Sequence, residues 1–231
     1  MPHPYLAGAE RPRVLAHRGF VSPAAAGRGV AENSLASVSA AVDAGAAYVE
    51  TDCHLTRDGV VVLFHDADLA RVLGDRRAIA QVEHAELSDL MASRGGLLTL
   101  ERALETFPET RFNIDVKAGA AAAPAGRIVA PHAGRVLLTG FSDGIRRRAL
   151  HAAESAAGRG SLLPATSPGR NALARVLLAL ASRSRARTER SLAGFDALQI
   201  PERRGAIRVL TSRLIEEAHR AGVEVHVWTV N

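Results

Sequence analysis

The sequence contains little lysine, cysteine or aromatic side chain. Of its 29 basic residues only Lys117 is a lysine, a single cysteine occurs at Cys53, and aromatic residues make up 4% of the chain. One cysteine allows no internal disulfide, which fits a reducing compartment, so we expect a cytoplasmic protein. No apolar run approaches the length of a membrane span, and the chain begins without the apolar core of a signal peptide.

The charge balance is basic, with a formal net charge of +5 at pH 7 and a pI near 10.5. The basic residues are scattered and few aromatic residues lie among them, which argues against nucleic-acid binding. Even the arginine-rich run at 183–190 is typical of the solvated end of a helix. We therefore expect a basic surface that favours anionic substrates and weak association with anionic membranes.

The strand predicted at 111–117 carries polar residues on one face. Asn113, Asp115 and Lys117 alternate with apolar residues and therefore share that face. In so apolar a chain, a polar face on a central strand is costly unless its groups bind one another or a ligand. A lone lysine among arginines is either a chance survival or a position that needs a compact ammonium group. Its polar neighbours favour the second interpretation.

The segment 50–66 places two carboxylates and a histidine around a turn. Glu50 and Asp52 are two residues apart and share a face of an extended strand. An Asp-Gly pair at 58–59 is typical of a hairpin turn, and the apolar run after it leads back to His65. Because so short a connection joins only antiparallel strands, His65 comes level with the carboxylates. The segment is either an ordinary hairpin with polar ends or part of a metal-assisted acid–base site.

Two further polar segments are candidates for anion binding. His17 and Arg18 end a short predicted strand and precede a glycine, a combination that suits an anion site as well as a simple turn. Glu32 lies just before a predicted helix whose N-cap is Asn33 or Ser34. It either complements the helix dipole or pairs with Arg18.

Predicted strands alternate with predicted helices, which indicates a parallel α/β architecture. If the return strand of the hairpin lies outside the main sheet, the remaining strands are one short of an eight-stranded barrel. These strands are predicted at 13–16, 46–52, 111–117, 135–139, 161–165, 197–200 and 223–230. Helices are predicted near 34–44, 101–107, 126–130, 145–155, 171–182 and 212–221, and the stretch 79–91 is predicted to be helical in part.

Six motifs follow one another along the chain. They are His17-Arg18-Gly19, Glu32-Asn33-Ser34, Glu50-Thr51-Asp52, His65-Asp66, Asn113-Ile114-Asp115-Val116-Lys117 and Val227-Trp228-Thr229-Val230-Asn231. Together they resemble the glycerophosphodiester phosphodiesterase family, of the phospholipase-C-like superfamily of TIM barrels. Any one motif is weak evidence, but all six have the order and spacing of the family and span residues 13–231.

The resemblance implies one domain over residues 1–231. Its fold would be α/β, a TIM (β/α)8-type barrel with the hairpin at about 50–66 projecting at the C-terminal face. Family members continue past the tryptophan motif through a helix to a final strand. We therefore expect a barrel that lacks its last β/α unit and is incomplete at the C-terminus, either as a truncated chain or with a partner chain completing it.

The resemblance also implies roles for particular side chains. Glu50, Asp52 and Asp115 would be the ligands of one divalent cation, Mg²⁺ or Ca²⁺. His17 and His65 would be the catalytic acid and base. Arg18, Lys117 and Trp228 would bind the substrate, and Glu32 would support the first loop. The family usually has glutamate where Asp115 stands, so the cation would lie closer to this strand or bind through a water molecule.

The implied activity is metal-dependent hydrolysis of glycerophosphodiesters to sn-glycerol 3-phosphate and an alcohol. A substrate hydroxyl next to the ester would attack phosphorus while one histidine removes its proton and the other protonates the leaving alcohol. Water would then open the cyclic phosphate with the two roles exchanged. Two alternatives stay open: a lysophospholipase-D-like phosphodiesterase, and a non-catalytic phosphate-binding remnant of a truncated barrel.

Overall fold

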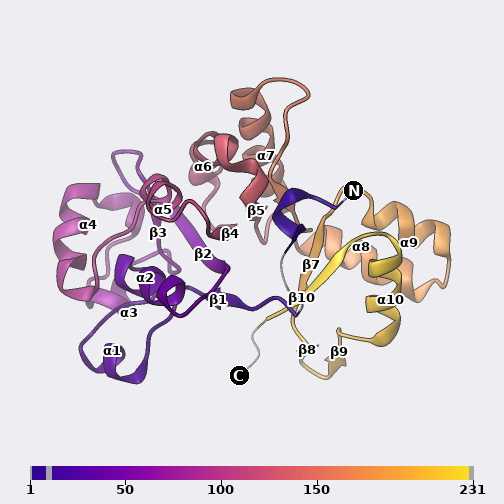
Figure 1. Cartoon of the computed structure of the whole chain (residues 1–231), viewed down its shortest axis with the longest axis horizontal. Helices are drawn as coiled ribbons and strands as arrows, with labels where there is room; N and C mark the ends of the chain where they lie inside the picture. The colour runs from indigo at the N-terminus through magenta and orange to yellow at the C-terminus, as the bar shows by residue number, and fades with distance from the viewer. Residues whose placement is uncertain (1, 9–11, 229–231) are drawn as a thin grey trace.

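The computed structural model of the chain describes residues 2–8 and 12–228 (Figure 1). Strands and helices alternate along it, as predicted. The strands are β1 (Leu15–His17), β2 (Tyr48–Leu55), β3 (Val61–Leu63), β4 (Arg111–Val116), β5 (Val136–Thr139), β6 (Ala165–Thr166), β7 (Ala197–Ile200), β8 (Arg203–Arg204), β9 (Ile207–Arg208) and β10 (Glu224–Val227). The α-helices are α1 (Pro23–Gly27), α2 (Leu35–Asp43), α3 (Ala70–Leu73), α4 (His84–Met91), α5 (Leu100–Thr106), α6 (Ala122–Val129), α7 (Asp143–Ala157), α8 (Arg170–Ala181), α9 (Arg185–Leu192) and α10 (Ser212–Arg220). Short 3₁₀ helices are η1 (Pro4–Leu6), η2 (Ile79–Gln81), η3 (Ala92–Arg94), η4 (Gly119–Ala121) and η5 (Ala130–Arg135).

The parallel strands follow one another around the wall of a barrel. β1, β2, β4, β5 and β6 pair in that order, and β7 pairs with β10. The two groups meet where the Asp196 N–H, just before β7, donates to the Thr166 carbonyl at 2.9 Å. An ion pair of 2.8 Å joins Arg13, before β1, to Glu224 of β10, although no backbone ladder joins these two strands within the described residues. This strand order confirms the predicted α/β barrel-type fold.

Alternation along the strands separates two apolar clusters. Outward-facing side chains such as Val49, Cys53 and Phe112 pack against α2, α5 and α6. Cys53 is a free, buried thiol. Inward-facing side chains near the N-terminal ends of the strands form a smaller cluster with η1, made of Tyr5, Leu6, Tyr48, Leu137, Ala165 and Ala197. Because η1 fills this end of the barrel with apolar groups, the opposite end is left for polar ones.

Three predicted segments differ from the structure. The strand expected at 161–165 is reduced to β6, because Pro164 has no N–H to donate to a ladder. The helix expected at 126–130 begins four residues earlier as α6, since the alanine-rich stretch before it is also helical. The basic run at 183–190 does not continue α8: Arg183 has a φ of 57°, and the separate helix α9 begins at Arg185.

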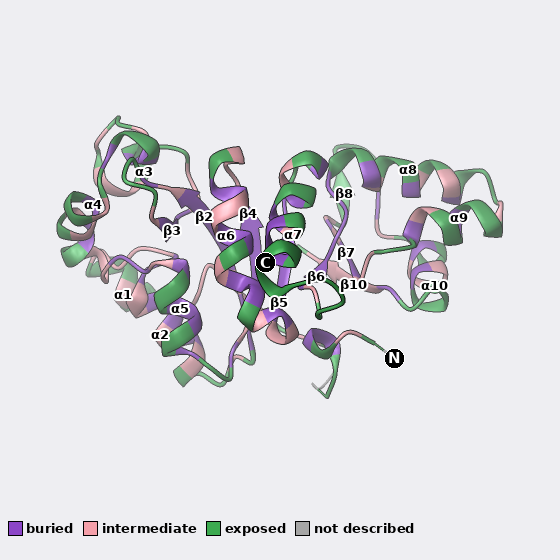
Figure 2. Cartoon of the chain, turned by 90° about the horizontal axis from the view of Figure 1, so that it is seen from above, coloured by how far each residue is buried: buried purple, intermediate pink, exposed green. Residues whose placement is uncertain are grey.

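The helices bury one face and expose the other, as Figure 2 shows. In α10, Leu214 and Ala218 are buried, whereas the charged residues between them are more accessible. Such helices cover a sheet on one side and meet water on the other. Nowhere in the described part of the chain does a helix have both the length and the apolar character needed to cross a membrane.

Candidate active site

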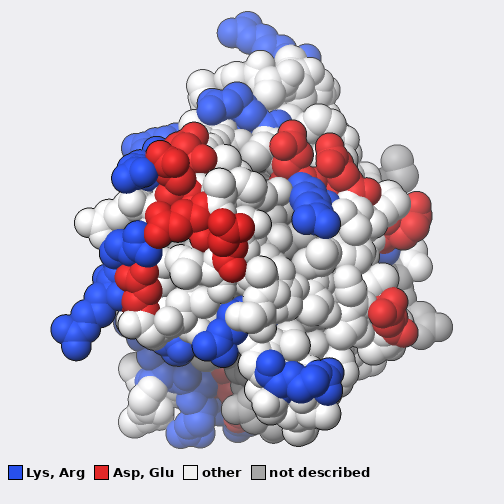
Figure 3. Space-filling view, turned by 90° about the vertical axis from the view of Figure 1, so that its left-hand side faces the viewer, with Lys and Arg blue, Asp and Glu red and all other residues white. Residues whose placement is uncertain are grey.

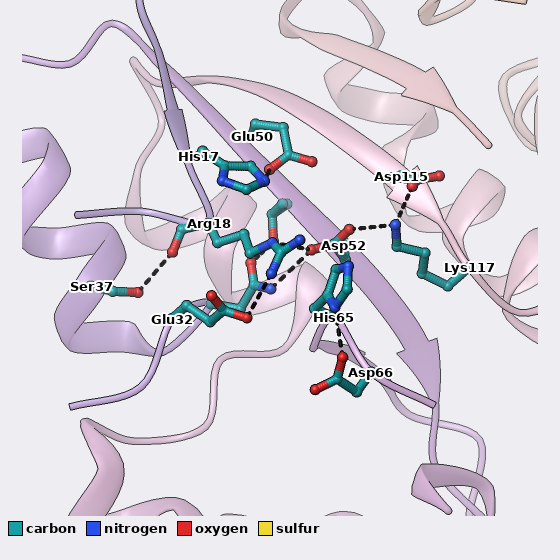
Figure 4. A network of polar contacts seen from close by, with 12 residues as sticks. His17, Arg18, Glu32, Ser37, Glu50, Asp52, His65, Asp66, Asp115 and Lys117 are labelled. Carbon is teal, nitrogen blue, oxygen red and sulfur yellow. Dashed lines mark hydrogen bonds and ion pairs between the residues drawn. The ribbon is translucent and has the colours of Figure 1, made fainter. Parts of the chain in front are cut away.

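Polar side chains gather at the C-terminal ends of β1, β2 and β4 (Figure 4). The strand register places His17 beside Glu50, Glu50 beside Asn113, and Asp52 beside Asp115. Because alternate side chains of a strand share a face, all five belong to the inner face of the barrel. Asp52, Asn113 and Asp115 are buried there. Three neighbouring strands thus bring one imidazole and three carboxylates to a single place.

The hairpin formed by β2 and β3 brings His65 to the same site. The two strands pair antiparallel, as predicted, and the Phe64 N–H donates to the Asp52 carbonyl at 2.9 Å. The ring of His65 lies next to the Asp52 side chain (Figure 4). Its Nδ1 is 2.7 Å from Asp66 Oδ1. With Nδ1–H donating to that carboxylate, Nε2 is the ring nitrogen available to a substrate.

The loop after β1 holds Arg18 over the carboxylates. Arg18 has a φ of 58°, in the left-handed region, and its N–H donates to the Glu50 carbonyl at 2.8 Å. Its guanidinium donates to Glu32 at 2.8 Å, and its Nε lies 3.4 Å from Asp52 Oδ2. The pairing of Glu32 with Arg18, one of two alternatives from the sequence, is therefore the one that the structure has.

Asn33 orients Asp52, a role that the sequence analysis missed. Its backbone also lies in the left-handed region, and its N–H donates to the Arg18 carbonyl at 2.9 Å. The amide of its side chain donates to Asp52 Oδ2 at 3.2 Å, and its Oδ1 accepts from Thr51 Oγ1 at 2.7 Å. The sequence indicated Asn33 only as a candidate helix cap, and Ser34 fills that role.

Lys117 joins two carboxylates from neighbouring strands. Its Nζ is 2.9 Å from Asp52 Oδ1 and 2.5 Å from Asp115 Oδ2. It also lies 4.8 Å from the centre of the Phe141 ring, within reach of a cation–π contact. Burial lowers the pKa of Lys117, but attraction by Asp115 and Asp52 outweighs this effect and raises its pKa overall. The ammonium group is therefore charged at neutral pH.

Two more residues, to which the sequence analysis gave no role, extend the network: Asp66 and Arg71. Arg71, on α3, has its Nε 2.6 Å from Asp66 Oδ2 and another guanidinium nitrogen 2.5 Å from Glu32 Oε1. Glu32 in turn binds Arg18, so a chain of ion pairs runs from His65 to Arg18. The adjacent His-Asp pair was a signal for Asp66, but nothing in the sequence indicates Arg71.

Burial and charge perturb the pKa values of two neighbouring groups of the site, His17 and Glu50. His17 is half-exposed, with Nε2 3.8 Å from Glu50 Oε2. Burial and then the charge of Arg18 lower the pKa of His17, so its imidazole is neutral at pH 7. Burial, followed by repulsion from Asp52 and Asp115, raises the pKa of Glu50 to about 8.

Oxygen atoms suited to a divalent cation are present in the site. Glu50 Oε2, Asn113 Oδ1 and Asp115 Oδ1 are buried and have no hydrogen-bond partner in the described part of the chain. Carboxylate and amide oxygens are the ligands that Mg²⁺ and Ca²⁺ prefer, and a cation would relieve the repulsion that raises the pKa of Glu50. These residues therefore fit a hard cation.

The predicted ligand set is not assembled as a ready-made site. Asp52 is engaged by Arg18, Asn33 and Lys117. Among residues 2–8 and 12–228, no group of three or more acidic, histidine or cysteine side chains has the arrangement of a metal site. The set of Glu50, Asp52 and Asp115 thus stays a prediction.

Trp228 lies at the end of β10, and its N–H donates to the Ile200 carbonyl at 3.1 Å. It alternates with Val227, so it shares the inner face of the barrel with His226. This placement fits the predicted position on the substrate side. Trp228 takes no part in the ion-pair network, and the rest of its motif, 229–231, lies outside the described residues.

Comparison with known proteins identifies the family. The sequence model of the glycerophosphoryl diester phosphodiesterase family matches residues 17–231. The chain belongs to this family. A relative from Mycobacterium tuberculosis, described as probable glycerophosphodiester phosphodiesterase 2, is 35% identical over 94% of this chain and 79% of its own length. This membership makes the chain a phosphoric diester hydrolase and supports glycerophosphodiester hydrolysis.

Two further relatives are informative. Lysophospholipase D GDPD1 of Rattus norvegicus is 34% identical over 46% of this chain and 36% of its own length. A phosphodiesterase of Oleispira antarctica, whose structure was solved in complex with the product sn-glycerol-3-phosphate, has a TM-score of 0.66 and 22% identity, covering 95% of this chain and 85% of its own. At that identity the likeness shows the α/β barrel-type fold alone.

Proposed function

We propose that the protein hydrolyses glycerophosphodiesters to sn-glycerol 3-phosphate and an alcohol, with His17 and His65 as acid and base. The observation that carries this proposal is the placement of both imidazoles beside Arg18 and Lys117 at one end of the barrel. Two histidines that can exchange protons and two cations that can bind phosphoryl oxygens are what phosphodiester cleavage requires.

The environments of the histidines suggest how they divide the work. The lowered pKa of His17 suits a base, which would take the proton of the substrate hydroxyl next to the ester. Asp66 would hold the His65 ring at Nδ1 and leave Nε2 toward the substrate, which suits an acid that protonates the leaving alcohol. Water would then open the cyclic phosphate, with His65 taking a proton and His17 returning one.

The phosphate would be held by Arg18 and Lys117. Lys117 would turn from Asp115 toward the phosphoryl oxygens, and this change needs only a rotation of its flexible side chain. Glu50, Asp115 and Asn113 are the candidates to hold Mg²⁺ or Ca²⁺, with Asp52 close by. Such a cation would offset negative charge on the phosphoryl group.

A turnover assay tests the proposal. The purified protein is incubated with glycerophosphocholine and Mg²⁺ or Ca²⁺, with and without chelator, and sn-glycerol 3-phosphate is measured. We expect cation-dependent release that is lost in His17→Ala and kept in His151→Ala, which removes an exposed histidine of α7. A folded protein that binds phosphate without turnover would support the non-catalytic alternative instead.

A lysophospholipase-D-like activity is the second candidate. Three large apolar side chains follow the C-terminal ends of strands and are about half exposed: Phe20 after β1 at 50%, Phe141 after β5 at 47% and Trp228 after β10 at 45%. An apolar rim of this kind would accommodate an acyl chain. Comparing kcat/KM for glycerophosphocholine and lysophosphatidylcholine decides between the two substrates, and Phe20→Ser should lower only the second value.

A further inference from the structure

A groove on the side of α8 and α10 combines an apolar floor with basic edges. It has a volume of about 430 Å³ and lies between the second half of α8, the β8–β9 hairpin and the start of α10. Its apolar lining includes Leu177, Leu180, Ile207, Val209 and Leu214, and its basic lining is Arg183, Arg208 and Arg213. A surface of this composition suits a ligand that is both apolar and negatively charged.

The groove and the candidate active site both adjoin segments that follow the C-terminal ends of strands. The β8–β9 hairpin and the start of α10 follow the C-terminal end of β7, and α8 follows the C-terminal end of β6. In Figure 2, α8 and β8 lie toward one edge of the molecule and the N-terminus toward the opposite edge. The Trp228 N–H donates to the carbonyl of Ile200, which lies just before the hairpin.

Exposed apolar side chains and basic side chains lie in and next to the groove. Ile207, which lines the groove, and Leu178, the neighbour of the lining residue Leu177 on α8, are each 70% exposed. Between positions 202 and 213 the chain has four arginines and one acidic residue, Glu202, whose carboxylate is 3.8 Å from Arg208. No carboxylate forms an ion pair with Arg183 or Arg213 within the described residues.

The opposite side of the molecule differs. In Figure 3, which shows the side of α4, acidic and basic side chains lie close together. Ion pairs such as Arg57–Glu83 and Arg77–Glu86 belong to this part of the chain. The basic and apolar character of the groove is therefore local and does not simply reflect the net charge of +5.

We propose that the groove and its hairpin form a docking surface for a membrane that contains anionic phospholipid. Ile207 and Leu178 would enter the interface between headgroups and acyl chains, and the arginines around them would bind the anionic headgroups. A second copy of the chain is a poorer occupant, because a two-fold interface through this face would oppose arginine to arginine.

Such docking would bring the rim of the barrel to the bilayer surface. Phe20, Phe141 and Trp228 lie on that same end, so an amphiphilic substrate would pass from the membrane into the site without crossing bulk water. The inference deepens the proposed function by naming where the substrate is met. Membrane binding is measured without turnover, so the docking proposal can fail while the proposed hydrolase function stands, and the reverse.

Vesicle sedimentation tests the proposal on the intact protein. We expect binding to vesicles of phosphatidylcholine and phosphatidylglycerol, weak binding to phosphatidylcholine alone, and weaker binding at high salt. The double variant Arg183→Gln/Arg213→Gln should bind less tightly by about fivefold for each charge removed. Ile207→Asn should also weaken binding and leave turnover of soluble glycerophosphocholine unchanged.

Matched variants at the other end of the barrel are the controls. Val14→Asn changes a β-branched residue that is 75% exposed just before β1, and Arg159→Gln removes an exposed charge just before β6. Neither should affect vesicle binding. Equal binding to both kinds of vesicle, or equal losses in the controls, would overturn the proposal. So would a protein that is dimeric in sedimentation velocity and becomes monomeric in Ile207→Asn, because the face would then join two copies.

Discussion

Single side chains decide which atoms of the candidate site can move a proton. Asp66 occupies Nδ1 of His65 and leaves Nε2 facing the site, and Arg71 holds Asp66 in place. Hydrogen bonds of this kind, behind the reacting group, set its tautomer and its orientation. Burial raises the pKa of Asp66, but the hydrogen bonds from His65 and Arg71 outweigh it and lower the pKa overall, so Asp66 is a carboxylate.

Asp66→Asn should therefore lower kcat more than it changes KM. The neutral amide binds the imidazole Nδ1–H more weakly than the carboxylate does and so orients the ring less firmly, and we expect a loss in kcat of about 10- to 100-fold. Steady-state kinetics with glycerophosphocholine measure the effect. Asp89→Asn, on the exposed face of α4, is the control and should behave as the parent protein. An unchanged kcat in Asp66→Asn would mean that the Asp66 carboxylate has no part in the action of His65.

Glu50 should make the cation-free protein less stable as the pH rises. Its pKa is about 8 when folded and near its ordinary value of 4.5 when unfolded. Between these values the folded carboxyl keeps a proton that the unfolded one has lost, so raising the pH reduces the free energy of unfolding. Between pH 6.5 and 8 the loss should be about 2 kcal/mol. Denaturant unfolding in chelator measures it, and Glu50→Gln should remove the dependence in this window.

At the scale of elements, two glycines with the same backbone conformation have different surroundings. Gly19 follows Arg18, and Gly59 lies in the β2–β3 turn; both have a φ of 84°. A Cβ on Gly19 would lie 2.6 Å from the Ser37 carbonyl, whereas nothing lies within 4 Å of one on Gly59. The first glycine is required by close approach of α2, the second only by the left-handed turn.

Replacing each glycine with alanine separates these two requirements. Gly59→Ala should cost about 1 kcal/mol of stability and leave turnover intact, because only the turn is strained. Gly19→Ala should cost more and also reduce turnover, since the loop that carries His17 and Arg18 must move away from α2. Thermal unfolding and the glycerophosphocholine assay, run in parallel, measure both. Equal turnover in the two variants would contradict the argument.

The hairpin was predictable because every signal for it is local. The Asp-Gly turn, the two-residue spacing of Glu50 and Asp52, and the short return to His65 all lie within 50–66. β6 was placed less well, because the apolar pair Leu162-Leu163 lies before Pro164, whereas the residues that pair with β5 are Ala165 and Thr166 after it.

At the scale of the whole molecule, the ion pair between Arg13 and Glu224 connects the first parallel strand to the last described one. Both side chains are largely buried, and two of the hydrogen bonds between them measure 2.8 and 2.9 Å. A buried pair is costly to break from one side, because the remaining charge loses its partner away from water. This pair therefore helps to keep the ends of the strand array together.

Glu224→Gln should lower the free energy of unfolding by about 3 kcal/mol. Glu189→Gln, which breaks the exposed pair with Arg185 on α9, should cost only about 0.5 kcal/mol. Chemical denaturation of both variants measures the difference. If the two losses were equal, the pair across β1 and β10 would have no special part in stability.

The sequence by itself determined the strand–helix alternation, the polar face of β4, the hairpin and the family, because these follow from periodicity and short spacing. Tertiary structure decided which polar groups meet. Asn33 donates to Asp52, 19 residues away, and Arg71 binds Glu32, 39 residues away. Lys117 lies between carboxylates of two strands. It also decided that arginines scattered along the chain border one apolar groove. Such contacts depend on how distant segments approach one another, which no local pattern of residues records.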